Sequence, residues 1–155
     1  MILDTQKGSI PADLKADVTI IGAGAAGITM ALELADAGLA VILLEAGGRA
    51  FSTASQEFYR AHAVEPASHG TVDMFRRRVF GGSTSVWGGR CIPFDPIDFE
   101  DRPWMAHGRW PIGYDDVARH YPRALDYAQA GPAAFLAGEA LPGGSSIGWL
   151  FKRMG

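Results

Sequence analysis

The feature of the sequence that most constrains the fold is a short glycine-rich turn, residues 22–27, with the sequence GAGAAG. Before it, residues 17–21 form an apolar, β-branched run, as expected of a buried parallel strand. After it, residues 28–35 are mostly apolar and predict a helix, which Gly38 ends as a C′ glycine does. Residues 40–44 predict a second buried strand that ends at Glu45. This order of strand, glycine turn, helix and strand predicts a β-α-β unit.

The unit predicts an α/β fold, in which a Rossmann-like domain begins with these two parallel strands. One helix cannot cover both faces of two buried strands, so more sheet must surround the unit. The length of 155 residues suits a single ordinary domain. We expect an irregular lead-in at residues 1–15, the nucleotide-binding domain at 16–130 and an Ala/Gly/Pro-rich tail at 131–155.

The remaining segments carry weaker signals. Residues 50–80 show no clear period, and the prolines of residues 93–113 favour an extended, packed connection. Residues 114–130 predict a helix, because Asp115 and Asp116 suit a helix N-terminus. Pro122 is expected to break or restart that helix.

Composition excludes several classes of function. The formal net charge is −3, and the only basic cluster, Arg76–Arg78, is expected to be a solvated surface run, with a phosphate-facing role as the alternative. We therefore expect no nucleic-acid partner. The single cysteine, Cys91, excludes an internal disulfide and CxxC metal motifs, and no apolar run approaches the about 20 residues that span a bilayer. With no secretory signal in residues 1–14, these features predict a cytoplasmic protein without a metal site.

The glycine turn has the chemistry of a dinucleotide site. Pyrophosphate needs backbone N–H donors and a favourable dipole, and a helix N-terminus supplies both. Gly22 permits the tight turn, Gly24 permits close approach of the phosphates, and Gly27 permits the helix to pack on the strand. Glu45 follows Gly27 by 18 residues, where an acidic group binds ribose hydroxyls and disfavours NADP. FAD and NAD both remain open at this point, and an ordinary strand-to-helix turn is the alternative.

A second glycine-rich segment, residues 80–90 with the sequence FGGSTSVWGGR, offers consecutive N–H groups and two hydroxyls with little bulk. Such a loop suits close contact with a cofactor, although a structural turn with a packed Trp87 would look similar. Together the two segments give the residues expected to bind the cofactor, which are Gly22, Gly24, Ala26, Gly27, Glu45, Gly81, Gly82, Ser83, Thr84 and Gly88.

Residues 17–48, with the strand end EAGG, and residues 81–90 resemble the glucose–methanol–choline (GMC) family of FAD-dependent oxidoreductases. The stretches PFDPIDF at 93–99, WPI at 110–112 and YPRA at 121–124 are also similar to bacterial members, so the resemblance covers residues 15 to about 128. It implies that residues 16–130 are the N-terminal part of a Rossmann-like FAD-binding domain, incomplete relative to the family, with the start of the substrate domain near its end. Some members attach FAD to a histidine of the second loop. Val86 stands at the matching position, which implies non-covalent FAD.

The resemblance implies oxidation of CH–OH groups in small-molecule alcohols or sugars, with hydride transfer to the flavin. The family's catalytic histidine pair comes from its C-terminal part, and no residue of this chain matches it. The four histidines, His62, His69, His107 and His120, have no visible catalytic partner, so we predict no catalytic residue here. We expect the FAD-binding portion of such an enzyme. The alternatives are a non-catalytic flavin- or nucleotide-binding module, working with a separate C-terminal chain, and an inactive truncated remnant.

Overall fold

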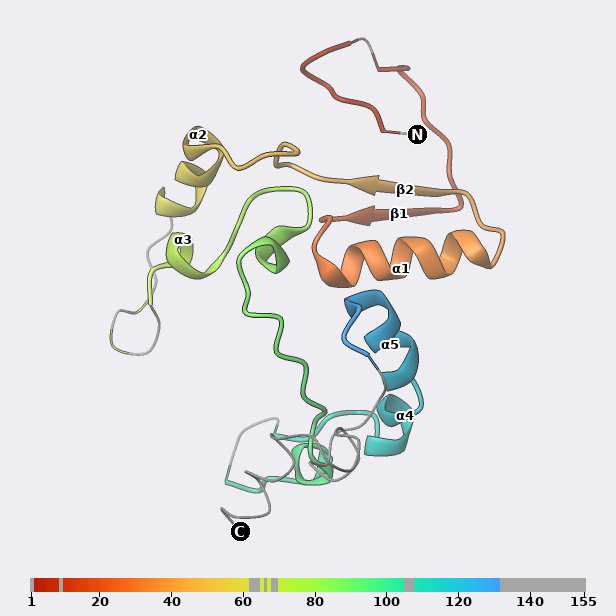
Figure 1. Ribbon diagram of the computed structural model, residues 1–155, viewed down its shortest axis with the longest axis vertical. Helices are drawn as coiled ribbons and strands as arrows, with labels where there is room; N and C mark the ends of the chain where they lie inside the picture. The colour runs from red at the N-terminus through yellow and green to blue at the C-terminus, as the bar shows by residue number, and fades with distance from the viewer. Residues whose placement is uncertain are drawn as a thin grey trace, which may run out of the picture. The chain divides into compact units, whose positions relative to one another are not determined.

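The computed structural model describes residues 2–8, 10–61, 65, 67, 70–104 and 108–131 (Figure 1). The predicted tail lies outside the described residues from residue 132 onward, as do His62, His69 and His107. The chain divides into two compact units, Met1–Trp87 and Gly88–Gly155.

The first unit is built on the predicted β-α-β arrangement. Strand β1 (Val18–Ile21) pairs in parallel with β2 (Val41–Leu44), in a register that places Val18 opposite Val41 and Ile21 opposite Leu44. Helix α1 (Ala25–Asp36) connects the strands and packs along both of them (Figure 1). The predicted strands and helix are confirmed, although the helix begins inside the glycine turn.

The C-terminus of α1 explains why the chain can turn back so soon into β2. Gly38 has a φ of 88°, and its N–H donates to the Ala35 carbonyl at 2.9 Å. The Leu39 N–H donates to the Leu34 carbonyl at 3.1 Å, which completes a Schellman motif. The sequence-based role of Gly38 as the C′ residue is confirmed.

The rest of the first unit consists of short helical turns. Helix α2 (Thr53–Gln56) runs into the 3₁₀-helix η1 (Glu57–Ala61), and α3 (Val72–Phe75) precedes the 3₁₀-helix η2 (Gly82–Ser85). Gly48 and Val79 form an isolated parallel bridge, which brings the end of the β2 segment beside the second glycine loop. A side chain at Gly47 would collide with the backbone between Arg78 and Val79, so this contact requires glycine.

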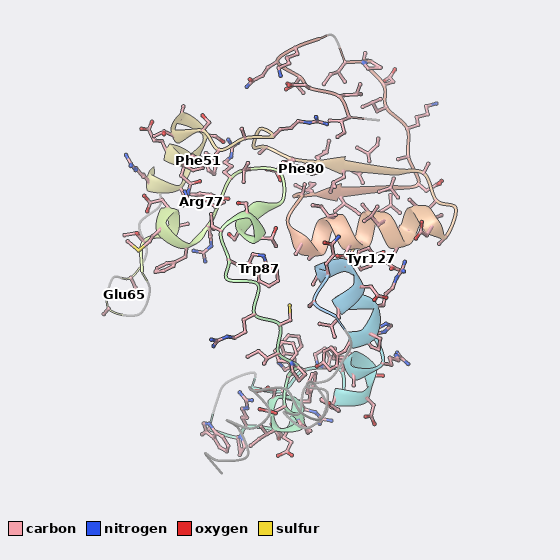
Figure 2. All side chains as sticks on the ribbon, in the orientation of Figure 1. Phe51, Glu65, Arg77, Phe80, Trp87 and Tyr127 are labelled. Carbon is pink, nitrogen blue, oxygen red and sulfur yellow. The ribbon has the colours of Figure 1, made fainter. Side chains whose placement is uncertain are left out.

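The arginine triplet is not simply a solvated run. The Arg77 guanidinium lies 4.7 Å from the Phe51 ring centroid (Figure 2). The Arg78 guanidinium lies 5.0 Å from the Phe58 ring centroid. Both arginines are half-buried, whereas Arg76 is exposed. The expectation of a solvated run is therefore wrong for Arg77 and Arg78, because aromatic faces cover part of each side chain.

The core of the first unit is small. Among the described residues, its buried apolar side chains are Ile20, Ala23 and Val79. Large apolar side chains on the strands stay open to solvent, since Ile21 is 86% exposed and Leu44 48%. The two-stranded sheet thus leaves uncovered apolar surface, as expected when one helix alone accompanies buried-type strands.

The second unit contains the 3₁₀-helix η3 (Pro96–Phe99) and helices α4 (Tyr114–Ala118) and α5 (Tyr121–Ala128). The predicted helix of residues 114–130 consists of two helices, α4 and α5. The predicted restart at Pro122 is confirmed, because Pro122 lies in the first turn of α5. The segment expected to be extended contains η3, at whose start the Asp95 N–H donates to the Asp98 carboxylate at 2.9 Å. This exception follows from the Asp-Pro start of that turn.

Candidate cofactor-binding site

The N-terminus of α1 is an open set of backbone donors. The first intrahelical bond runs from the Ile28 N–H to the Gly24 carbonyl at 2.9 Å, so the N–H groups of the preceding turn have no intrahelical acceptor. No side chain caps this end, and no acidic residue lies in the first turn. Ala26, the second residue of the helix, is exposed there. Unsatisfied N–H groups and the positive end of the dipole together suit an anion such as a pyrophosphate.

The three glycines of the first loop differ in why a side chain would be unfavourable or tolerated at each position. Gly22 has a φ of 101°, which residues with a side chain rarely adopt, and its N–H donates to the Leu44 carbonyl at 2.7 Å. A Cβ at Gly27 would collide with the Gly22 carbonyl, so the helix can approach the strand end only with glycine there. A Cβ at Gly24 would meet no atom within 4 Å. The close approach of a phosphate at Gly24 stays a prediction, and this free space is compatible with it.

Glu45, which directly follows β2, is hydrogen-bonded to the first glycine loop. Its Oε2 accepts the Ala23 N–H at 2.8 Å, and its Oε1 accepts the Gly47 N–H at 2.6 Å. The carboxylate therefore holds the turn between Gly22 and Gly24 as well as the chain after β2. A carboxylate has about four lone-pair positions, so about two remain for other donors. The binding of ribose by Glu45 stays a prediction, whereas these two bonds to the backbone are observed.

The second glycine loop packs directly on the first. The Gly81 N–H donates to the Ala23 carbonyl at 2.8 Å, and the Phe80 N–H donates to the Gly48 carbonyl at 2.9 Å. A Cβ at Gly82 would lie 3.2 Å from the Gly24 Cα, tighter than ordinary contact. Gly81 and Gly82 also have positive φ angles of 91° and 59°. Glycine at both positions therefore permits the two loops to meet.

Three predicted site residues behave differently from the others. The Ser83 hydroxyl donates to the Phe75 carbonyl at 3.3 Å, and the Thr84 hydroxyl donates to the Gly81 carbonyl at 2.5 Å. Each hydroxyl thus donates its one hydrogen bond to a backbone carbonyl, so it can only accept hydrogen bonds from a ligand. Gly88 belongs to the second compact unit, so its role at this site stays a prediction.

Sequence reasoning missed Ala23, the fully buried residue between the first two glycines. Its N–H donates to Glu45 and its carbonyl accepts from Gly81, so its backbone joins both loops and the end of β2. No side-chain signal marks such a residue, because the backbone makes both bonds. The available clue was its position between two glycines.

Among the described residues, no group of three or more His, Cys, Asp and Glu residues could hold a metal ion. His120, the one histidine in the described part, lies in the second unit beside Arg119, whose Nε donates to its Nε2 at 3.3 Å. No helix within the described ranges is long and apolar enough to cross a membrane.

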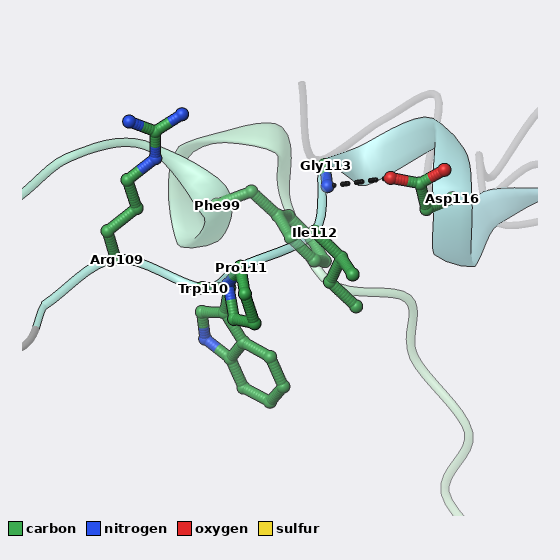
Figure 3. Close-up of a pocket in the computed structure, with 7 residues that line it drawn as sticks. All are labelled: Phe99, Arg109, Trp110, Pro111, Ile112, Gly113 and Asp116. Carbon is green, nitrogen blue, oxygen red and sulfur yellow. Dashed lines mark hydrogen bonds between the residues drawn. The ribbon is translucent and has the colours of Figure 1, made fainter.

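The second unit has a shallow pocket of about 430 Å³ (Figure 3). Its lining includes Phe99, Arg109, Trp110 and Asp116, and the Asp116 carboxylate accepts the Gly113 N–H at 3.0 Å. That bond caps α4, so Asp116 has a structural function in the pocket wall.

Comparison with known proteins decides which cofactor the chain binds. The sequence profile of the FAD dependent oxidoreductase (DAO) family matches residues 17–125. The chain belongs to this family. The cofactor of this family is FAD, so the prediction of FAD is confirmed. In an FAD dependent oxidoreductase the open N-terminus of α1, the free space at Gly24 and the Glu45 carboxylate are the features expected to hold a dinucleotide.

This FAD dependent oxidoreductase chain is also similar to paromamine 6′-oxidase from Streptomyces fradiae. The two are 28% identical over 116 residues, which cover 68% of this chain and 21% of that oxidase. The chain therefore spans about a fifth of the length of this relative.

Proposed function

We propose that this chain is the FAD-binding part of a GMC-type oxidoreductase that acts on CH–OH groups of small alcohols or sugars. The observation that carries the proposal is the junction of the two glycine loops at the uncapped start of α1. There the Gly81 N–H reaches the Ala23 carbonyl at 2.8 Å, and Glu45 braces the same residue. The GMC resemblance rests on these loops, because both contribute motifs to it.

In this proposal the chain's own groups divide the work of holding FAD. The N–H groups at the start of α1 bind the pyrophosphate, and the absence of a side chain at Gly24 lets the phosphates approach the backbone. Glu45 accepts hydrogen bonds from ribose hydroxyls through its remaining lone pairs. The loop from Gly81 to Ser85 lies against the first loop and bounds the site. When bound, FAD supplies a flavin ring that accepts a hydride from the substrate.

The substrate class and the missing catalytic groups are further parts of the proposal. The relative is by its name an oxidase of paromamine at the 6′ position, which supports a small-molecule substrate. Because the chain spans 21% of that relative, we place the catalytic base in polypeptide beyond the sequence described here. FAD is held non-covalently, since Val86 offers no nucleophilic nitrogen at the position where some GMC members carry histidine.

A titration of the whole chain tests this proposal. FAD, FMN, ADP and NADP are added separately, and binding is followed by quenching of the protein's tryptophan fluorescence and by calorimetry. We expect FAD to bind best and ADP to compete with it, because both carry the ribose and pyrophosphate that this site recognises. FMN lacks the adenylate half and NADP carries a 2′-phosphate that Glu45 repels, so both should bind much more weakly.

Gly24→Val is the decisive variant. The added side chain enters free space, so the fold should persist while the phosphates are blocked, and FAD affinity should fall by about a hundredfold or more. Gly8→Val is the matched control, because a Cβ at Gly8 would also meet no atom within 4 Å but Gly8 lies in the lead-in. Undiminished FAD binding by the Gly24 variant would contradict the proposed site.

The alternative is a non-catalytic flavin-binding module, in which the same two loops hold FAD without a substrate reaction. Turnover separates the two. The FAD-loaded chain is assayed with alcohols and sugars and an artificial electron acceptor. Activity from this chain alone would contradict our placement of the base elsewhere, and flavin that comes down with acid-precipitated protein would contradict non-covalent binding.

A further inference from the structure

Gln56, the last residue of α2, is the buried polar side chain of the described core, with 7% exposure. Its amide is almost fully satisfied. Nε2 donates to the Asp73 carbonyl at 2.8 Å and to the Arg76 carbonyl at 2.6 Å, and Oε1 accepts the Arg78 N–H at 3.2 Å. Two carbonyls and one N–H as partners fix which end of the amide is nitrogen.

These bonds tie together parts of the chain that are 17 to 22 residues apart. All three partners are backbone groups of one segment, residues 73–78, that follows η1 and leads into the second glycine loop (Figure 1). Ser55 bonds to the same segment, because its hydroxyl donates to the Arg78 carbonyl at 3.3 Å and accepts from the Arg78 guanidinium at 3.0 Å. The end of α2 therefore fixes both ends of this segment.

Residues 73–78 are in turn hydrogen-bonded to the second glycine loop. The Ser83 hydroxyl bonds the Phe75 carbonyl at 3.3 Å and accepts the Arg77 N–H at 3.2 Å. Beyond the segment, Val79 is buried and pairs with Gly48, and Gly81 bonds to Ala23. The loop thus lies between the first glycine loop on one side and backbone that Gln56 fixes on the other.

We propose that Gln56 is a positioning residue for the FAD site: it holds the cofactor loop, residues 81–85, through the backbone of residues 73–78. This inference rests on the proposed function, since it assigns the loop to FAD. Without the Gln56 amide, two part-buried carbonyls and one part-buried N–H lose their protein partners. The segment then loosens, and FAD must order the loop when it binds, which lowers affinity.

Gln56→Glu tests the proposal, because it keeps the shape of the side chain and makes its hydrogen bonding depend on pH. The ionised carboxylate still accepts from Arg78 but cannot donate, and it faces the carbonyls of Asp73 and Arg76. The protonated acid donates to one of these carbonyls. Burial beside carbonyl oxygens raises the pKa of the introduced carboxyl. Donation is therefore present below that pKa and is lost as the pH rises through it.

FAD dissociation constants are measured for wild type and variant across this pH range, and their ratio is taken at each pH. We expect the variant to bind FAD about tenfold more weakly at alkaline pH and to recover to within about threefold at mildly acidic pH. The neighbouring charged groups, the Asp73–Arg60 pair at 3.5 Å and the side chains of Arg76, Arg77 and Arg78, are the same in both proteins. Gln6→Glu, the same change at an exposed position, should show a ratio near one at every pH.

Ser83→Ala supplies a second test that does not depend on the folding of the Gln56 variant. It removes the bonds from the loop to Phe75 and Arg77, so it should weaken FAD binding on its own. Combined with Gln56→Glu at alkaline pH, it should add little, because both act through the same segment. Additive losses, or a pH-independent ratio near one in the Gln56 variant, would overturn the positioning role. A wild-type chain that binds no FAD would instead overturn the proposed function itself, and this inference with it.

Discussion

Different kinds of contact stabilise the two compact units of this chain internally. In the first unit, backbone bonds join distant segments, as between Gly22 and Leu44 or Gly81 and Ala23. In the second unit, aromatic rings join the segments: Phe94, Phe99, Trp110 and Tyr114 form a cluster in which neighbouring ring centroids are about 6 Å apart.

The difference shows what each unit requires of its sequence. A site made of backbone groups depends on where side chains are absent, so glycine positions determine it. A cluster of rings depends on the volume that side chains fill, and exchange of one ring changes stability locally. Substitutions of the two kinds should therefore separate FAD binding from the stability of the second unit.

Gly27→Val should give the largest effect. The added side chain collides with the Gly22 carbonyl, so α1 must move away from the strand end. We expect a loss of about 3 kcal/mol of stability together with the loss of FAD binding. Urea unfolding followed by circular dichroism measures the first, and FAD titration the second. A stable variant with wild-type affinity would show that the close packing of helix and strand is dispensable.

Trp110→Ala tests whether the aromatic cluster stabilises the second unit. Trp110 contacts Phe94 and Phe99 but is 49% exposed, so its removal should cost about 2 kcal/mol, below the range for fully buried tryptophan. FAD affinity should stay within about twofold of wild type. Thermal unfolding and FAD titration provide the measurements. A large loss of FAD affinity in a folded variant would show that the second unit contributes to the site.

Glu45→Gln should have a smaller effect on the first unit. The amide keeps one acceptor oxygen, but its NH₂ group then faces either the Ala23 or the Gly47 N–H. We expect about a tenfold loss of FAD affinity and a loss of about 1 kcal/mol in stability. Calorimetric titration and urea unfolding check both numbers. Affinity unchanged from wild type would remove Glu45 from the site.

Arg119→Ala should have the smallest effect. Its guanidinium lies 3.7 Å from the Asp116 carboxylate, and the arginine side chain is 68% exposed. Such surface pairs contribute about 0.3–0.5 kcal/mol, so the midpoint of thermal unfolding should barely change. A shift comparable to that of Trp110→Ala would mean that charge, rather than ring packing, holds the second unit together.

Local signals in the sequence predicted much of the first unit. The period of the apolar residues gave β1, α1 and β2, and Gly38 gave the helix end, because these features depend on neighbouring residues only. The roles of Gln56 and Ser83 could not be predicted in this way. Their partners are supplied by backbone of other segments, up to 22 residues away for Gln56, and backbone acceptors leave no pattern in a sequence.

Other parts of the sequence analysis needed the structure for a different reason. Two arginines of the triplet pack on Phe51 and Phe58, a contact that charge patterning alone does not reveal. The hydroxyls of Ser83 and Thr84 were expected at the cofactor, and the structure shows them donating within the protein. The DAO family membership fixes FAD, whereas GMC membership and a cytoplasmic location stay predictions.

The central claim is that FAD sits where the two glycine loops meet, and hydrogen exchange of the whole chain with and without FAD tests it most directly. We predict slower amide exchange in residues 22–27 and in residues 81–85 when FAD is bound, because the cofactor covers the first loop and orders the second. FAD that binds tightly while leaving exchange in both loops unchanged would contradict the account.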